Sequence, residues 1–210
     1  MKWEEVYQSL CERHTKEVQD RLLNSHVAIA GLGGLGSTIA ISLARAGVGH
    51  LHLIDFDRVD LSNLNRQQYR MKDIGRYKTE CLKEIIEEIN PYVEIIIDTV
   101  RLDEDKIKTI FNKDEIICEA FDQPEAKSML IDGFFTYYGK EKKIVSGTGM
   151  AGYESSNLIH TRKINDQFYL CGDETNGLEQ GKSLMAPRVG ICAGHEANMV
   201  IRLILECTEV

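Results

Sequence analysis

Residues 27–70 read VAIAGLGGLGSTIAISLARAGVGHLHLIDFDRVDLSNLNRQQYR. The apolar run at the start ends in glycines, and apolar residues then recur at helical spacing from Ser37 to Arg45. A second apolar run follows and ends in an acidic residue, Asp55. The pattern predicts a strand, a tight glycine turn, a helix and a second strand, which is how a nucleotide-binding unit begins.

The glycine turn carries the first candidate binding residues. Gly31, Gly33 and Gly36 match the spacing G-x-G-x-x-G. Glycine suits this turn because it adopts unusual backbone angles and lets phosphate oxygens approach the N–H groups at the helix start. Asp55 lies 19 residues after Gly36, where a carboxylate can accept hydrogen bonds from ribose hydroxyls. These features alone fit a dehydrogenase as well as an ATP-binding enzyme.

The residues after Asp55 favour ATP. The segment DFDRVDLSNLNRQ places Asn63, Arg66 and Gln67 at the mouth of the predicted fold, and GRYK adds Lys78 near the start of a helix. A triphosphate brings more negative charge than the bridged phosphates of NAD, and arginine and lysine can neutralise it. The sequence therefore predicts an ATP site.

Further along the chain, apolar strand-like runs alternate with helical patterns. Alternating strands and helices predict a Rossmann-like α/β fold, in which a mainly parallel sheet has helices on both faces. Near the C-terminus, SNLIHTRK and DQFYLCG predict a short antiparallel extension, followed by a helix from about Arg188 to Glu206. We expect a single domain over residues 1–210. Its predicted parts are an N-terminal helix within residues 1–24 (about Glu4 to Leu22), a nucleotide-binding core over 25–150, and the extension, a crossover loop and the last helix over 151–210.

Composition narrows the class of protein. The formal net charge of -8 and the pI of about 5.3 argue against nucleic acid or an anionic membrane as the main partner. No apolar run is long enough for a membrane span, and the first residues are polar and acidic. Six cysteines occur without any C-x-x-C pair, which is typical of free thiols in a reducing compartment. We therefore expect a cytoplasmic protein.

Several motifs together resemble one known family. GLGGLG, AGVG, LIDFDRVDLSNLNRQ, GRYK and EAFDQPEAK occur in the order and spacing of the ThiF/MoeB adenylyltransferases, the bacterial relatives of ubiquitin-activating enzymes. The resemblance covers most of the chain and is strongest to the short ThiF type, which activates the sulfur carrier ThiS of thiamine biosynthesis. The segment containing Asn63 and Arg66 is more diagnostic of the family than the glycine turn.

The resemblance implies roles for individual residues. Asp55 resembles the carboxylate that holds the ATP ribose, and Arg66 and Lys78 resemble the pair that contacts the triphosphate. Asp122, in EAFDQP, resembles the aspartate that positions Mg²⁺ and is needed for adenylation. A carboxylate there is also chemically apt for a hard cation that bridges phosphate oxygens, although Asp122 could instead cap the helix that begins near Pro124. The remaining residues that the resemblance places at the nucleotide are Gly31, Gly33, Gly34, Gly36, Asn63 and Gln67.

The reaction that the resemblance implies is attack of a carboxylate on the α-phosphate of ATP, which gives an acyl-adenylate and pyrophosphate. The carboxylate would be the C-terminal glycine of a small ubiquitin-like carrier that ends in Gly-Gly. The resemblance also implies that the protein is a homodimer, in which a basic residue near the N-terminus reaches the ATP site of the neighbouring subunit. Arg13 matches that segment. Lys16 occupies the position where the family usually has arginine, and lysine cannot bind phosphate in a bidentate manner.

The chain departs from the family in its cysteines. Many members carry two C-x-x-C pairs that bind zinc, and their absence here predicts that there is no structural zinc. Cys192 and His195 are three residues apart on the last predicted helix, but two ligands are too few for a structural zinc site. Some members also have a reactive cysteine in the crossover loop. Here the region contains only Cys171, which precedes the loop, so an enzyme that stops at the acyl-adenylate is the simpler prediction.

Other functions remain as alternatives. A relative that adenylates a MoaD-like carrier of the molybdopterin pathway, or a small-molecule or tRNA carboxylate, is the nearest of these. An NAD-dependent dehydrogenase would need a second catalytic segment, and the sequence contains none that we recognise. A non-catalytic carrier-binding module is disfavoured because such modules typically lose the charged residues that this chain retains.

Overall fold

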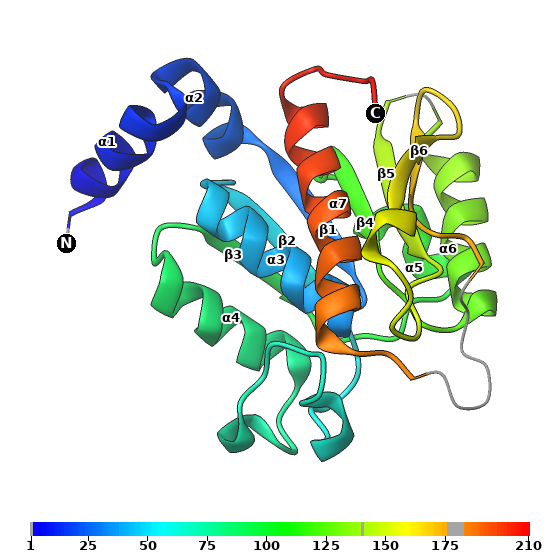
Figure 1. Cartoon of the computed structure of the whole chain (residues 1–210). Helices are drawn as coiled ribbons and strands as arrows, with labels where there is room; N and C mark the ends of the chain where they lie inside the picture. Colours follow the sequence, from blue (N-terminus) through cyan, green and yellow to red (C-terminus); the bar gives the residue numbers. More distant parts are fainter. Residues whose placement is uncertain (1, 140, 176–182) are drawn as a thin grey trace.

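The computed structural model describes residues 2–139, 141–175 and 183–210. Its centre is a seven-stranded sheet in the order β3-β2-β1-β4-β5-β7-β6 (Figure 1). Every neighbouring pair is parallel except β6 and β7. The strands are β1 (His26–Ala30), β2 (His50–Ile54), β3 (Glu94–Asp98), β4 (Ile116–Glu119), β5 (Lys143–Thr148), β6 (His160–Lys163) and β7 (Phe168–Gly172).

Helices cover both faces of the sheet. The helices are α1 (Trp3–His14), α2 (Lys16–Asn24), α3 (Gly34–Ala46), α4 (Lys78–Ile89), α5 (Glu104–Ile110), α6 (Pro124–Tyr137) and α7 (Ala186–Ile204), with short 3₁₀ turns η1 (Leu61–Asn63), η2 (Met71–Asp73) and η3 (Ser156–Leu158). One buried cluster joins α3, α4 and α7 to one face, and a second joins α5 and α6 to the other. Along β1, Val27 and Ile29 belong to the first cluster and Ala28 and Ala30 to the second, as expected for a parallel strand buried on both sides. The predicted Rossmann-like fold is confirmed.

The predicted antiparallel extension is β6 and β7. Strand β7 also pairs in parallel with β5, so the pair continues the main sheet instead of forming a separate layer. The sequence did not predict α5, a helix of seven residues. In the part of the chain that the structure describes, no helix has the length and apolar character needed to cross a membrane.

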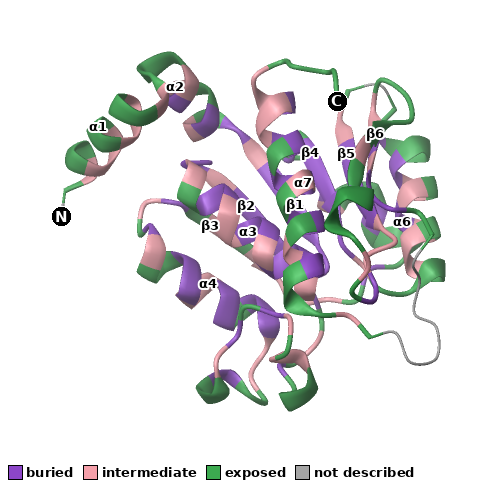
Figure 2. Ribbon diagram, in the orientation of Figure 1, coloured by how far each residue is buried: buried purple, intermediate pink, exposed green. Residues whose placement is uncertain are grey.

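The prediction of a single N-terminal helix is wrong, because the segment forms two helices, α1 and α2. Thr15 separates α1 from α2 with a φ of 77°, a region that a β-branched residue rarely adopts. Its hydroxyl accepts a hydrogen bond from the Val18 N–H at 3.4 Å and so caps α2. The break lets α2 bury Leu22 against the core, whereas α1 buries none of its residues and projects from the body (Figures 1 and 2).

A buried histidine ties β2 to the neighbouring segments. The Nε2 atom of His52 lies 2.8 Å from Asp98 Oδ2, and its Nδ1 atom lies 2.9 Å from Asp114 Oδ2. Burial alone would lower the pKa of His52, but the hydrogen bonds and charges of Asp114 and Asp98 outweigh burial and raise it above the ordinary value. His52 therefore stabilises the fold most when it is protonated.

We expect His52→Gln to destabilise the protein in a pH-dependent way. The folded-state pKa is above the unfolded value of about 6.5, so the imidazolium contribution is complete below about pH 6.5 and is lost as pH rises through the folded pKa. The difference in unfolding free energy between wild type and variant should be about 2 kcal/mol near pH 6 and should narrow toward pH 9. Urea titrations over this range measure it, and a gap that is constant with pH would contradict the assignment.

Candidate active site

A pocket of about 910 Å³ lies at the carboxyl ends of the strands. Strand β1 lies between β2 and β4, so successive strands are added first on one side of β1 and then on the other. This point of reversal is where open α/β sheets bind ligands. The pocket is lined by the glycine turn after β1, by Asp55 after β2, by the segment from Ala120 to Lys127 and by the end of β5.

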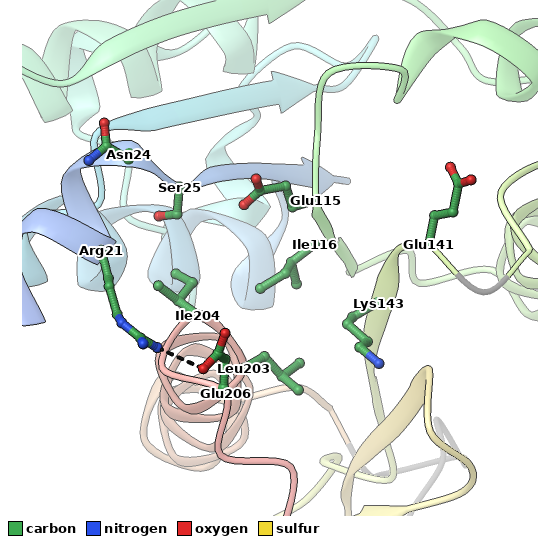
Figure 3. Close-up of a pocket in the computed structure, with 10 residues that line it drawn as sticks. All are labelled: Arg21, Asn24, Ser25, Glu115, Ile116, Glu141, Lys143, Leu203, Ile204 and Glu206. Atoms are coloured by element: carbon green, nitrogen blue, oxygen red, sulfur yellow. Dashed lines mark ion pairs between the residues drawn. The ribbon is translucent and has the colours of Figure 1, made fainter.

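A second hollow lies near the start of β1 and β4 (Figure 3). Its volume is about 580 Å³, and Arg21 forms a 3.2 Å ion pair with Glu206 at its edge. None of the site residues predicted from the sequence lines this hollow. The larger pocket is therefore the candidate active site.

The glycine turn is shaped by two close backbone approaches. Gly31 has a φ of +92°, and a Cβ atom there would lie 2.8 Å from the carbonyl oxygen of Ala120. A Cβ atom on Gly36 would lie 1.8 Å from the carbonyl oxygen of Gly31. At Gly33, in contrast, an added Cβ atom would meet only Gln67 Nε2 at 3.8 Å. Gly31 and Gly36 are thus required by the fold, whereas Gly33 leaves room at the pocket.

Helix α3 begins at the pocket without a side-chain cap. Gly33 is its N-cap residue and Gly34 its first residue, and both line the pocket. The first N–H groups of a helix have no partner within the helix, and together with the helix dipole they form an anion-binding site. The turn and α3 therefore form a helix start of the kind that can bind an anion, and phosphate binding there stays a prediction.

Asp55 connects β2 to the glycine turn. One carboxylate oxygen accepts the Leu32 N–H at 2.7 Å and the other accepts the Asp57 N–H at 2.8 Å. Burial raises the pKa of the Asp55 carboxyl, while the Lys78 ammonium opposes that shift. Each oxygen has a further lone pair, so the carboxylate can still accept hydrogen bonds from a ligand.

The structure brings the two predicted cations, Arg66 and Lys78, to the same pocket. Lys78 is the first residue of α4 and is 5% exposed, with its Nζ atom 2.8 Å from Asp57 Oδ2 and 3.9 Å from Asp55 Oδ2. Arg66 donates through one terminal nitrogen to Asn65 Oδ1 at 2.8 Å. Within the described residues, its buried Nε atom has no hydrogen-bond partner. A bound anion would therefore meet Lys78, which can exchange its carboxylate partner, and Arg66, whose Nε donor has no partner among the described residues.

Gln67 and Asn63 occupy different positions. Gln67 lines the pocket, and its buried Oε1 atom has no partner among the described residues. Asn63 does not line the pocket. Its side-chain oxygen accepts the Asp60 N–H at 3.0 Å, and its carbonyl oxygen accepts the N–H groups of Arg66 and Gln67. Asn63 thus orders the turn that carries the two residues after it.

Asp122 is exposed and lines the pocket in the loop between β4 and α6. Helix α6 starts at Pro124 with Gln123 as its N-cap, and the Gln123 side chain makes no capping hydrogen bond. No hydrogen bond among the described residues therefore supports the alternative role of Asp122 as a helix cap. Its carboxylate makes no hydrogen bond or ion pair with any residue that the structure describes.

Arg13 and Lys16 do not join the pocket of their own chain. Arg13 lies on α1, and Lys16 starts α2, which leads into the amino end of β1. The pocket lies at the opposite ends of the strands. Lys16 pairs instead with Asp20 on the same helix. Either residue could reach a pocket of this kind only in a second copy of the chain.

Cys171 is buried on β7 and does not line the pocket. Burial, and then the charge of Glu196, raise the pKa of its thiol well above the usual range, which disfavours the reactive thiolate. Residues 176–182 of the predicted crossover loop lie outside the described residues. Cys192 contacts the Cys171 carbonyl, and His195 contacts the Thr161 hydroxyl at 3.0 Å. Across the described ranges, no group of three or more His, Cys, Asp or Glu side chains is placed to hold a metal ion.

Sequence reasoning missed Lys127 and its partners. Lys127 lines the pocket from α6, and its ammonium contacts the buried Glu119 carboxylate and donates to the Gly147 carbonyl at 2.8 Å. Phe56 also lines the pocket, with the Arg101 guanidinium 5.5 Å from its ring centre. Because Phe56 directly follows Asp55 in the sequence, its position beside the pocket could have been predicted. The pairing of Glu119 with Lys127 depends on the direction of α6, which the sequence does not specify.

The fold and the pocket define a doubly wound α/β protein with a site suited to a phosphorylated ligand. The profile of the ThiF family matches residues 7–210, and the chain belongs to this family. It is 30% identical over 195 residues to the molybdopterin-synthase adenylyltransferase of Salmonella typhimurium, a match that covers 90% of this chain and 76% of the relative. The Escherichia coli protein of the same name is 30% identical over 193 residues, covering 89% and 75%. The names of both relatives confirm the predicted enzyme class, adenylyltransferase.

Among solved structures, the chain is similar to E. coli tRNA N6-threonylcarbamoyladenosine dehydratase in complex with ATP. The TM-score is 0.86, with 97% of this chain and 95% of the other covered. Sequence identity is 18%, so this likeness supports the fold alone.

We expect Gly33→Ala to weaken nucleotide binding while the protein remains folded. The added methyl group has room in the protein but occupies space where phosphate oxygens would approach the turn. The affinity for ATP should fall about tenfold, the equivalent of one hydrogen bond to a charged group, with little change in Tm. Gly190→Ala is the matched control, because its Cβ atom would meet nothing within 4 Å. ATP titration and thermal unfolding test this, and wild-type affinity in Gly33→Ala would show that phosphates do not approach here.

Proposed function

We propose that this protein transfers AMP from ATP to the C-terminal glycine carboxylate of a small ubiquitin-like sulfur carrier. The observation that carries the proposal is the pocket at the point where the strand order reverses. It combines an uncapped helix start, two cations and an exposed carboxylate. Membership of the ThiF family supports the same reaction.

Individual residues would hold ATP at one end of the pocket. Asp55 would accept the ribose hydroxyls, and the N–H groups at Gly33 and Gly34 would face the phosphates. Lys78 would exchange Asp57 for a phosphate oxygen, and Arg66 would use donors that include its unpartnered Nε atom. Because charge-assisted hydrogen bonds are roughly twice as strong as neutral ones, these residues favour a polyphosphate.

Asp122 is the residue that would hold Mg²⁺. A single exposed carboxylate fits this ion, because Mg²⁺ keeps several water ligands and is bound by one or two carboxylates together with phosphate oxygens. When bound, the ion would neutralise charge on the phosphates. The protein itself would contribute the position of the carboxylate in the pocket wall.

The chemical step needs little from the protein beyond positioning. A carboxylate oxygen of the carrier attacks the α-phosphorus, and a new P–O bond forms. The bond from that phosphorus to pyrophosphate breaks, and pyrophosphate leaves with the bonding electrons. Holding the two anions in line and neutralising the developing charge account for catalysis of this kind. The buried Cys171 supports an enzyme that ends at the acyl-adenylate and leaves sulfur delivery to another protein.

The carrier that we propose first is ThiS-like, in thiamine biosynthesis, on the basis of the motif resemblance. A MoaD-like carrier is the second candidate, because the two named relatives are molybdopterin-synthase adenylyltransferases. We place the reaction in the cytoplasm, and the six free cysteines are in keeping with a reducing compartment. Carrier-dependent ATP–pyrophosphate exchange, measured with each purified carrier and without one, distinguishes the candidates. Exchange with neither carrier would contradict the proposal.

We expect Asp122→Ala to lower carrier-dependent exchange by about a hundredfold or more, because the metal would lose its protein ligand. Asp132→Ala is the matched control, since it removes an exposed carboxylate from α6. The control should exchange at the wild-type rate, and both variants should keep the wild-type Tm. Full activity of Asp122→Ala would refute the assigned role.

We propose that the enzyme is a homodimer in which Arg13, with Lys16 beside it, acts at the pocket of the other subunit. The position of α1 supports this, because the helix projects from the body and buries none of its own residues (Figure 1).

Mixed dimers test this arrangement. Arg13→Ala and Asp122→Ala should each be nearly inactive alone. Co-expression should restore about a quarter of wild-type exchange, since half of randomly formed dimers contain both chains and each has one intact site. No recovery in heterodimers of confirmed composition would show that Arg13 acts within its own chain or not at all.

A further inference from the structure

A buried carboxylate, Glu119, lies directly beneath the loop that carries Asp122. Glu119 is the last residue of β4 and is fully buried. One of its oxygens accepts the Phe121 N–H at 2.8 Å. The other accepts the Ser146 hydroxyl and the Lys127 ammonium. The three donors come from three segments of the pocket wall: the loop before α6, strand β5 and α6 itself.

The same network fixes the end of β5. Lys127 donates to the Gly147 carbonyl, and Gly147 lines the pocket. Behind Gly147 lies Glu196 of α7, which fills the space that a side chain would need, because a Cβ atom on Gly147 would lie 2.3 Å from Glu196 Oε1. Burial raises the pKa of the Glu196 carboxyl well above its usual value, while Lys127 opposes the shift. The Lys127 ammonium forms its ion pair with the Glu119 carboxylate.

Stability alone is a weak reason for such an arrangement. A buried ion pair can often be replaced by apolar side chains of similar volume without loss of stability, because both charges must be removed from water. What the apolar replacement cannot supply is an acceptor for the Phe121 N–H. That N–H belongs to the residue immediately before Asp122.

We infer that Glu119 is a positioning residue, which holds the loop through the Phe121 N–H so that Asp122 is presented to a nucleotide-bound metal ion. Lys127 and Ser146 hold the Glu119 carboxylate in place from the other side. The loop is also confined by the glycine turn, since the Ala120 carbonyl is the group that Gly31 approaches. This inference rests on the proposed function, because it takes Asp122 as the metal-binding carboxylate.

Two double variants isolate the Phe121 hydrogen bond. Glu119→Gln with Lys127→Met, and Glu119→Leu with Lys127→Met, both remove the two charges of the ion pair. Only the glutamine variant keeps an oxygen that can accept the Phe121 N–H. The measurement is the factor by which Mg²⁺ tightens ATP binding, obtained by titration with and without the metal, and it needs no carrier.

In the glutamine variant, Mg²⁺ should tighten ATP binding by the same factor as in wild type. In the leucine variant this factor should be smaller by about tenfold or more, which is the size of effect found when a residue that orients a metal ligand is removed. In an Asp122→Ala background, the glutamine and leucine variants should give the same factor. Equal Mg²⁺ factors in the glutamine and leucine variants that retain Asp122 would overturn the inference. A lower factor in the leucine variant than in the glutamine variant when Asp122 is replaced by alanine would also overturn it.

A single variant covers the case in which the leucine variant does not fold. Glu119→Asp keeps both charges but shortens the side chain by one methylene, which withdraws the acceptor from Phe121. It should also reduce the Mg²⁺ factor, and a wild-type factor there would overturn the inference. Carrier-dependent exchange by wild type is measured separately. If wild type catalyses exchange but the glutamine and leucine variants show equal Mg²⁺ factors, only the positioning role of Glu119 is refuted. If wild type catalyses no exchange with any carrier, the proposed function is refuted, and the Mg²⁺ factors alone then decide the role of Glu119.

Discussion

The pocket depends on how closely the glycine turn after β1 approaches the end of β4. Gly31 lies against the Ala120 carbonyl, and Gly36 lies against Gly31, so neither position has room for a side chain. Their contact sets the distance between the start of α3 and the loop that carries Asp122. The start of α3 and the loop that carries Asp122 therefore both border the pocket.

Hydrogen bonds from Asp55 and Glu119 extend this constraint. Asp55 accepts N–H groups from Leu32 in the glycine turn and from Asp57, and Glu119 accepts the N–H of Phe121. In both cases a buried carboxylate at the end of a strand fixes the loop that follows. Buried acceptors must be satisfied, so each one restricts the conformations available to the loops. The glycine turn and the loop that carries Asp122 are therefore held by carboxylates at the ends of β2 and β4.

The sequence predicted the parts of this arrangement that depend on local pattern. The glycine turn, Asp55 and the α3 and α4 helices follow from spacing and periodicity, and Arg66, Lys78 and Asp122 follow from motifs. The break at Thr15 could not be predicted, because it uses a backbone conformation that threonine rarely adopts. The role of Asn63 at the nucleotide stays a prediction; the structure shows that Asn63 orders the turn that carries Arg66, a role that motif position does not reveal. The network of Glu119, Lys127 and Ser146 joins three elements, and only the folded sheet brings them together.

The charge of the chain adds a final constraint on what the pocket can bind. With a formal net charge of -8, the protein as a whole repels both ATP and an acceptor carboxylate. Two of the cations that line the pocket already have carboxylate partners, because Lys78 is paired with Asp57 and Lys127 with Glu119. A ligand must offer more concentrated negative charge than the Asp57 carboxylate to take Lys78 from it, which a polyphosphate does and a single carboxylate does not. Under the proposed function, a polyphosphate would therefore displace Asp57 from Lys78, whereas an acceptor carboxylate would need further contacts elsewhere on the protein surface to bind.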